Sequence, residues 1–134
     1  MISWFGKEVH AQKILEWSDF TKGISWESET DFAIFREAIF SPELMDLEGK
    51  EVIVTGYFLV LDGTQSIYML SKNPMASCFF CGNGGPETII ELEFTEKPSF
   101  KMDDLLSVSG TLRLNRNNPN HCYYRIEEAE ALGL

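Results

Sequence analysis

Three cysteines and a histidine are the residues best suited to chemistry in this sequence. Cys78 and Cys81 are separated by two phenylalanines and followed by Gly82, and His121 and Cys122 lie further along the chain. A Cys-x-x-Cys pair followed by glycine is typical of a metal knuckle, in which backbone amides turn toward the thiolates. Two further nitrogen or sulfur ligands complete a tetrahedral zinc site. The pattern therefore offers Cys78, Cys81, His121 and Cys122 as zinc ligands.

Two other interpretations of these cysteines stay open. Cys78 and Cys81 could form a disulfide or a thiol/disulfide pair, although a redox pair usually begins a helix and strand-like segments flank this one. Alternatively, the thiols are buried as small apolar side chains, beside packed phenylalanines. Adjacent residues on a strand point to opposite faces, so His121 and Cys122 can share one metal ion only where the backbone is irregular.

Basic and aromatic residues near the C-terminus point to different chemistry. Arg113, Arg116 and Arg125 lie near Tyr123, with no acidic residue among them. Proteins that bind single-stranded nucleic acid combine such cations with aromatic rings that stack on bases. The whole chain, however, has 21 acidic and 11 basic residues and a net charge of −10, which repels phosphate backbones. A single-stranded nucleic-acid interface in the loop 115–121 is therefore an alternative that the overall charge disfavours.

The hydrophobic pattern predicts the elements that position these residues. A strand over 51–61 is apolar on both faces around Gly56, as expected of a strand that bends and serves two sheets. Asp62 and Gly63 then predict a hairpin turn. Further strands are predicted at 66–71, 88–94, 105–115 and 122–128. The sequence therefore predicts an all-β fold, a five-stranded OB-like barrel that is closed or partly open.

The predicted barrel brings distant residues to one end. Successive strands alternate in direction, so the loops after the second and fourth strands open at the same end and place Cys78 and Cys81 near His121 and Cys122. Glu91 alternates with apolar residues in the third strand and is expected to face solvent. In the last strand, Cys122 is expected on the same face as Tyr124 and Ile126. The end that holds the cysteine loop is thus the candidate site.

Residues 1–47 are predicted to wrap the barrel as an N-terminal arm. Their aromatic residues are expected to cover apolar surface; these are Trp4, Trp17, Trp26, Phe32, Phe35 and Phe40. Ser41, Pro42 and Glu43 provide a cap, a proline at the first helical position and an acid in the first turn, which predicts a short helix to about Asp46. A length of 134 residues suits one domain, with the arm at 1–47 and the barrel at 48–132 of a single domain 1–134.

Composition excludes several classes of protein. Apolar residues make up 44% and aromatic residues 13% of the chain, as in ordinary globular proteins. No apolar run approaches the roughly 18 residues of a membrane span, and Lys7 and Glu8 stand where a signal peptide is apolar. An odd number of cysteines excludes a dense disulfide scaffold. We therefore expect no membrane span and no signal peptide.

Four stretches carry a resemblance to a known family. They are 49–57 (GKEVIVTGY), 71–87 (SKNPMASCFFCGNGGPE), 108–115 (VSGTLRLN) and 123–130 (YYRIEEAE). Together they resemble a family of small uncharacterised bacterial proteins with an OB-like barrel, several of which are exported. The resemblance covers about 46–132, and the CFFCG block is its most specific part. It implies the barrel and an envelope location, and it transfers no catalytic residue.

These observations predict a binding module rather than an enzyme. The expected ligand is a partner protein, a metal such as zinc, or a small molecule. The two alternatives are a single-stranded nucleic-acid binder that uses the loop 115–121, and a thiol/disulfide protein that uses Cys78 and Cys81. The sequence leaves the compartment and the oligomeric state open.

Overall fold

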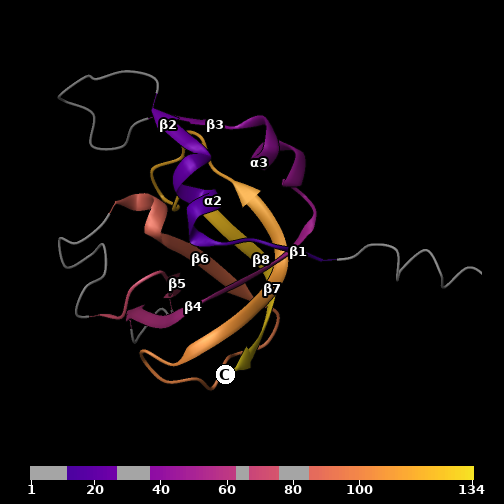
Figure 1. Cartoon of the computed structure of the whole chain (residues 1–134). Coiled ribbons are helices and arrows are strands. Elements are labelled where there is room, and N and C mark those ends of the chain that lie inside the picture. Colours follow the sequence, from indigo (N-terminus) through magenta and orange to yellow (C-terminus); the bar gives the residue numbers. More distant parts are fainter. Residues whose placement is uncertain (1–11, 27–36, 63–66, 76–84) are drawn as a thin grey trace, which may run out of the picture.

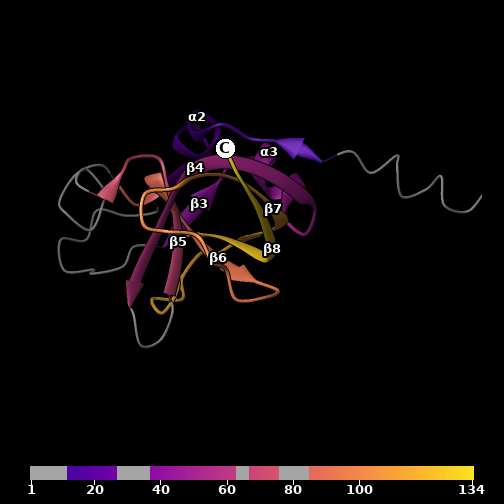
Figure 2. The ribbon, with the colours of Figure 1, turned by 90° about the horizontal axis from the view of Figure 1, so that it is seen from below.

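Five strands close into a barrel in the computed structural model of the chain, which describes residues 12–26, 37–62, 67–75 and 85–134. The strands are β4 (Glu51–Asp62), β5 (Ile67–Ser71), β6 (Ile89–Phe94), β7 (Leu105–Leu114) and β8 (Tyr124–Gly133). Their order is β4-β5-β6-β8-β7, and pairing of β7 with β4 closes the barrel. Only the β6–β8 pairing among these is parallel. This arrangement confirms the prediction of an all-β, OB-like barrel (Figures 1 and 2).

Strand β4 was expected to serve two sheets; it lies in a single closed sheet and pairs with two barrel strands along successive parts of its length. It pairs with β7 from Glu51 to Tyr57 and with β5 from Tyr57 to Asp62. Gly56 lies where the partner changes. A Cβ atom there would lie 2.7 Å from the Ser71 carbonyl oxygen and 2.9 Å from the Trp17 ring. Glycine is therefore needed at this position for the close approach of both neighbours.

The last strand differs most from its prediction. It covers Tyr124–Gly133 instead of 122–128, so Cys122 precedes it. Tyr124 and Ile126 face the core as expected, whereas Cys122 packs outside the barrel, and the expectation that all three share a face is wrong. Glu128 has a positive φ of 53° at a bulge. The bulge interrupts the alternation at the residue where the pattern suggested that the strand ends.

The N-terminal segment adds short elements to the barrel. These are β1 (Lys13–Ile14), α2 (Trp17–Lys22), β2 (Ile24–Trp26), β3 (Ala38–Phe40) and α3 (Pro42–Leu47), and a 3₁₀ turn, η4 (Pro86–Thr88), precedes β6. β1 is an extra strand parallel to β4, and β2 and β3 form a separate two-stranded sheet. The helices and this small sheet lie together at one end of the barrel, uppermost in Figure 1. None of the helices in the described ranges has the length and apolar character of a membrane span.

The short helix α3 begins as its sequence predicts. The Ser41 hydroxyl accepts a hydrogen bond from the Leu44 N–H at 3.2 Å, and Pro42 occupies the first turn. Helix α2 was not predicted, because six residues are too few to display a helical period. Glu16 and Asp19 form a capping box at its start. Among the aromatic residues expected to cover the barrel, Trp4, Phe32 and Phe35 lie outside the described residues.

The arm contributes to the core itself. Phe20, Phe40 and Leu44 are buried together with the inward residues of the barrel strands. The Tyr124 hydroxyl donates a hydrogen bond to the Phe20 carbonyl at 2.7 Å, which joins α2 to β8. Burial, with a smaller contribution from the charge of Glu87, raises the pKa of Tyr124. The hydroxyl thus stays protonated and remains a donor.

Candidate functional site

The Asn115 side chain makes several hydrogen bonds within the loop between β7 and β8. The Asn115 amide donates to the carbonyls of Asn118, His121 and Cys122 at 2.8, 3.1 and 3.1 Å, and its oxygen accepts from the Asn118 N–H at 3.0 Å. Asparagine is suited to such turns because its amide can replace backbone partners. The loop therefore presents His121 and Cys122 in a defined position at the end of the barrel.

The Glu91 carboxylate contacts both His121 and Cys122. Its Oε1 accepts the Cys122 N–H at 3.0 Å, and its Oε2 lies 3.0 Å from His121 Nδ1. An ionised carboxylate can only accept, so this contact places the ring hydrogen of His121 on Nδ1. The backbone here is irregular rather than a strand, so the two neighbouring side chains need not point to opposite faces. Glu91, which was expected simply to face solvent, instead organises the loop.

The Cys122 side chain turns to the outer surface of β4 and β5. Its Sγ lies 3.8 Å from Met69 Sδ, and Leu59, Leu61 and Met75 belong to the same cluster. Burial, and then the charge of Glu91, raises the pKa of Cys122 from an ordinary 9.0 to about 12. The residue is therefore a neutral thiol at physiological pH.

A reactivity measurement checks this state of Cys122. In the full chain with Cys78→Ser and Cys81→Ser, we expect the remaining thiol to react with a disulfide reagent at pH 8 at least about 100-fold more slowly in the folded than in the unfolded protein. The raised pKa also implies stability that is complete below about pH 9 and declines as the pH rises toward 12. Equal reaction rates in both states would contradict the burial of the thiol.

The predicted zinc ligands are brought together only in part. His121 and Cys122 lie beside the same carboxylate, whereas Cys78 and Cys81 lie outside the described residues. Ser71 pairs with Ile89, and β6 runs parallel to β8, so the segment between β5 and β6 begins and ends at the barrel end that holds the 115–123 loop. Within the described ranges no group of three or more His, Cys, Asp or Glu is arranged to hold a metal ion. Zinc at Cys78, Cys81, His121 and Cys122 stays a prediction.

The three arginines of the nucleic-acid alternative all form ion pairs. Arg113 Nε lies 2.9 Å from Glu127, and Arg125 lies 3.3 Å from Glu127 and 3.6 Å from Glu93. Arg116 is 3.0 Å from Glu37. The hydrogen bond and charge of Glu127 raise the pKa of Arg113.

The aromatic residue of that alternative is also engaged. Tyr123 is only 6% exposed, and its ring packs edge-on against Trp26 with centroids 6.0 Å apart. A base can stack only on a ring with a free face, and phosphate must compete with the carboxylates for the arginines. Nucleic-acid binding through the loop 115–121 stays a prediction, and in this arrangement the arginines that would contact phosphate are already paired with carboxylates.

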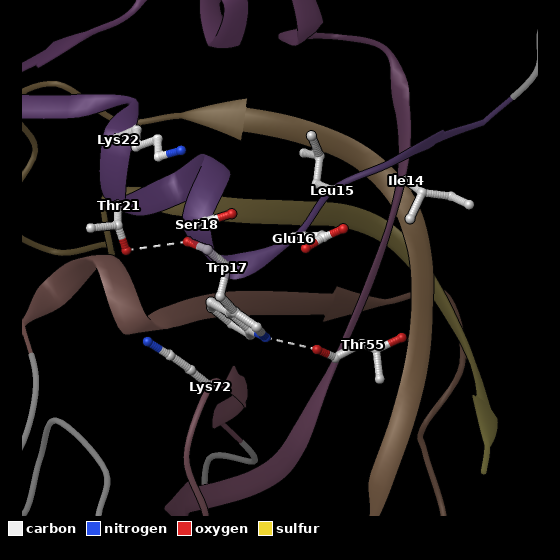
Figure 3. Close-up of a pocket in the computed structure, with 9 residues that line it drawn as sticks. All are labelled: Ile14, Leu15, Glu16, Trp17, Ser18, Thr21, Lys22, Thr55 and Lys72. Carbon is white, nitrogen blue, oxygen red and sulfur yellow. Dashed lines mark hydrogen bonds between the residues drawn. The ribbon is translucent and has the colours of Figure 1, made fainter.

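A second site lies where the edge of β4 is left uncovered between β1 and β5. β1 pairs with β4 only at Val52 and Ile53, and β5 joins β4 at Tyr57. Trp17 fills the interval: its indole N–H donates to the Thr55 carbonyl at 2.7 Å (Figure 3). This contact could not be predicted from local patterns, because it joins two residues that are far apart in the chain.

An open pocket of about 620 Å³ adjoins this contact. It is lined by Ile14, Leu15, Glu16, Trp17, Ser18, Thr21, Lys22, Thr55 and Lys72 (Figure 3). Lys22 comes from α2 and Lys72 follows β5, and neither forms an ion pair within the described part of the chain. The Thr21 hydroxyl donates to the Trp17 carbonyl at 3.2 Å. The pocket therefore combines an indole ring and two available ammonium groups.

Comparison with known proteins supports the fold. No protein-family model matches the chain, and no curated protein matches its sequence. The structure is similar to the crystal structure of a DUF3299 family protein from Pseudomonas aeruginosa PAO1, with a TM-score of 0.61 and 14% identity over 92% of this chain and 97% of that chain. At this identity the likeness concerns the fold alone. It agrees with the resemblance to uncharacterised bacterial proteins and does not bear on the CFFCG loop or on export.

Proposed function

We propose that the protein is a non-enzymatic binding module that holds a small anionic molecule in the pocket beside Trp17. The observation that carries this proposal is the contrast between the basic residues of the two sites. The arginines near the 115–123 loop are paired with carboxylates. Lys22 and Lys72 instead share a pocket, with no ion pair to either among the described residues.

The physical character of the lining favours this ligand class. A volume of about 620 Å³ falls within the roughly 300–1,000 Å³ of ligand pockets. Trp17 supplies a half-buried aromatic surface held in place by Thr55, and lysine ammonium groups act as point charges for carboxylate or phosphate. Glu16 is the acidic residue of the lining, and it is part of the capping box of α2.

A small molecule suits the pocket better than the other expected ligands. The lining lacks the cysteine and histidine donors that a zinc site requires. The charges are also local: the chain as a whole is at −10, so long-range attraction does not draw anions to it. Binding must come from short-range contacts inside the pocket, whose lining includes both lysines.

Titration with phenyl phosphate, followed by amide and indole NMR signals, tests the proposal. We expect the Trp17 indole signal, assigned with Trp17→Phe, to shift on addition of phenyl phosphate and to stay unchanged with neutral benzyl alcohol. Lys22→Met and Lys72→Met should each weaken binding about fivefold, since an exposed charge pair contributes up to about 1 kcal/mol. Lys101→Met, in the β6–β7 loop, is the matched control and should bind as the wild type does.

Two results would overturn the proposed function. One is the absence of any shift at Trp17 with phenyl phosphate at low salt. The other is an affinity for phenyl phosphate that is the same in Lys22→Met, Lys72→Met and Lys101→Met. The anion would then be held elsewhere.

A further inference from the structure

A small cluster of sulfur-containing side chains lies outside the barrel core. Leu59 and Met69 are buried there, and Leu61, Met75 and Cys122 pack against them. Met69, Met75 and Cys122 form the sulfur cluster. It is separate from the main core and from the pocket beside Trp17. An apolar cluster of this size needs no sulfur for its packing, so the identity of the side chains calls for explanation.

The spacing of two of the sulfurs suits a shared ion. Met69 Sδ and Cys122 Sγ are 3.8 Å apart. Two sulfurs that each lie about 2.3 Å from one ion, the usual metal–thiolate distance, are themselves about 3.8–4.6 Å apart for ligand angles from tetrahedral to linear. The observed separation is at the short end of this range, so an ion can enter with a small movement of the Cys122 side chain.

We propose that the sulfur cluster binds a soft monovalent metal ion of the Cu(I) class, with Met69 Sδ and Cys122 Sγ as ligands and Met75 beside them. Thioether and thiol ligands select such ions over the harder divalent cations. Leu59 and Met69 are buried, so water has little access to the Met69 thioether.

The charge balance of the site favours a monovalent ion. Binding forms a metal–sulfur bond and breaks the S–H bond of Cys122, whose proton leaves to solvent. The site therefore keeps the same net charge, because one monovalent cation replaces one proton. The other members of the cluster are apolar side chains and thioethers, so the Cys122 thiolate is the one anionic ligand among them and balances the charge of a monovalent ion. This selectivity distinguishes the sulfur cluster from the predicted zinc site.

Methionine methyl NMR with Ag(I) as the probe tests the proposal directly. The chain has five methionines, so each labelled methyl can be assigned by substitution. In the full chain with Cys78→Ser and Cys81→Ser, we expect one equivalent of Ag(I) to shift the Met69 methyl and to release one proton per ion. The Met45 and Met102 methyls, which are exposed at 56% and 41%, should not move. If the serine variants fail to fold, the Met69 methyl is followed in the wild-type chain with further equivalents of Ag(I), because Cys78 and Cys81 also bind this ion.

Variants separate binding from folding. Met69→Leu keeps an apolar side chain without sulfur and should weaken Ag(I) binding at least about tenfold, since even the loss of a supporting partner costs that much at metal sites. Met102→Leu is the matched control and should bind normally. Thermal unfolding of the metal-free proteins checks that both variants fold. The proposal is overturned if the Met69 methyl does not shift, if Met69→Leu binds as Met102→Leu does, or if Zn(II) binds the cluster as tightly as Ag(I).

Discussion

Phe20→Ala is expected to lower the free energy of unfolding by about 3–5 kcal/mol. The ring is fully buried, with its centroid 4.6 Å from that of Tyr124 and 5.7 Å from that of Trp17. Truncation leaves a cavity between α2 and β8. The barrel strand cannot move to fill it without breaking its pairing with β6 and β7, so most of the cavity persists.

Urea denaturation followed by tryptophan fluorescence measures this effect. Thr21→Ala, at the next and exposed position of α2, is the control and should change stability by less than about 0.5 kcal/mol. The loss of free energy of unfolding for Phe20→Leu should lie between the losses for Phe20→Ala and Thr21→Ala. A loss below about 1 kcal/mol for Phe20→Ala would show that α2 is not anchored to the barrel as described.

The same substitution links the fold to the proposed ligand pocket. Helix α2 carries Trp17 and Lys22, and its six residues are too few to be stable alone. Phe20 is its buried anchor, together with the hydrogen bond from Tyr124. Loss of the Phe20 side chain is therefore expected to disturb this wall of the pocket as well as the core.

The barrel could be predicted because each strand carries its own local signal. Alternation in β7, the acid-and-apolar pattern of β6 and the glycine at the centre of β4 are all readable within a single strand. The helix α3 was readable for the same reason, since its cap and proline are adjacent in sequence. Strands that follow one another pair antiparallel in β4–β5, β5–β6 and β7–β8, but β6 pairs in parallel with β8 and β7 pairs with β4, so the strand order as a whole is not readable within single strands.

The site residues could not be predicted in the same way, because their partners are distant in sequence. Glu91 meets His121, Met69 meets Cys122, and Trp17 meets Thr55 only after the strands have paired. Placing the start of the last strand two residues early also put Cys122 on the wrong face. Cys122 lies in the irregular loop before β8, so the alternation of the strand does not set the direction of its side chain.

The bulge in β8 leads to the second large expected effect. Gly110 of β7 faces the bulge, where β8 has one more residue than its partner. A Cβ atom at Gly110 would lie 2.5 Å from Ile126 Cγ2 and 2.6 Å from the Glu127 carbonyl oxygen. The Ile126 side chain is buried and the carbonyl belongs to the backbone, so neither group can move away without a large cost in free energy. We expect Gly110→Ala to destabilise the protein by about 2–3 kcal/mol.

Gly133→Ala is the matched control for this prediction. Gly133 also lies in the β7–β8 pairing, but a Cβ atom there would meet only Phe100, at 3.9 Å. Its substitution should change the urea midpoint by little, while Gly110→Ala lowers it clearly at unchanged slope. Similar effects at both glycines would mean that the bulge can relax. In that case Glu127, which the bulge aligns with Arg113 and Arg125, would owe its position to the ion pairs rather than to the backbone.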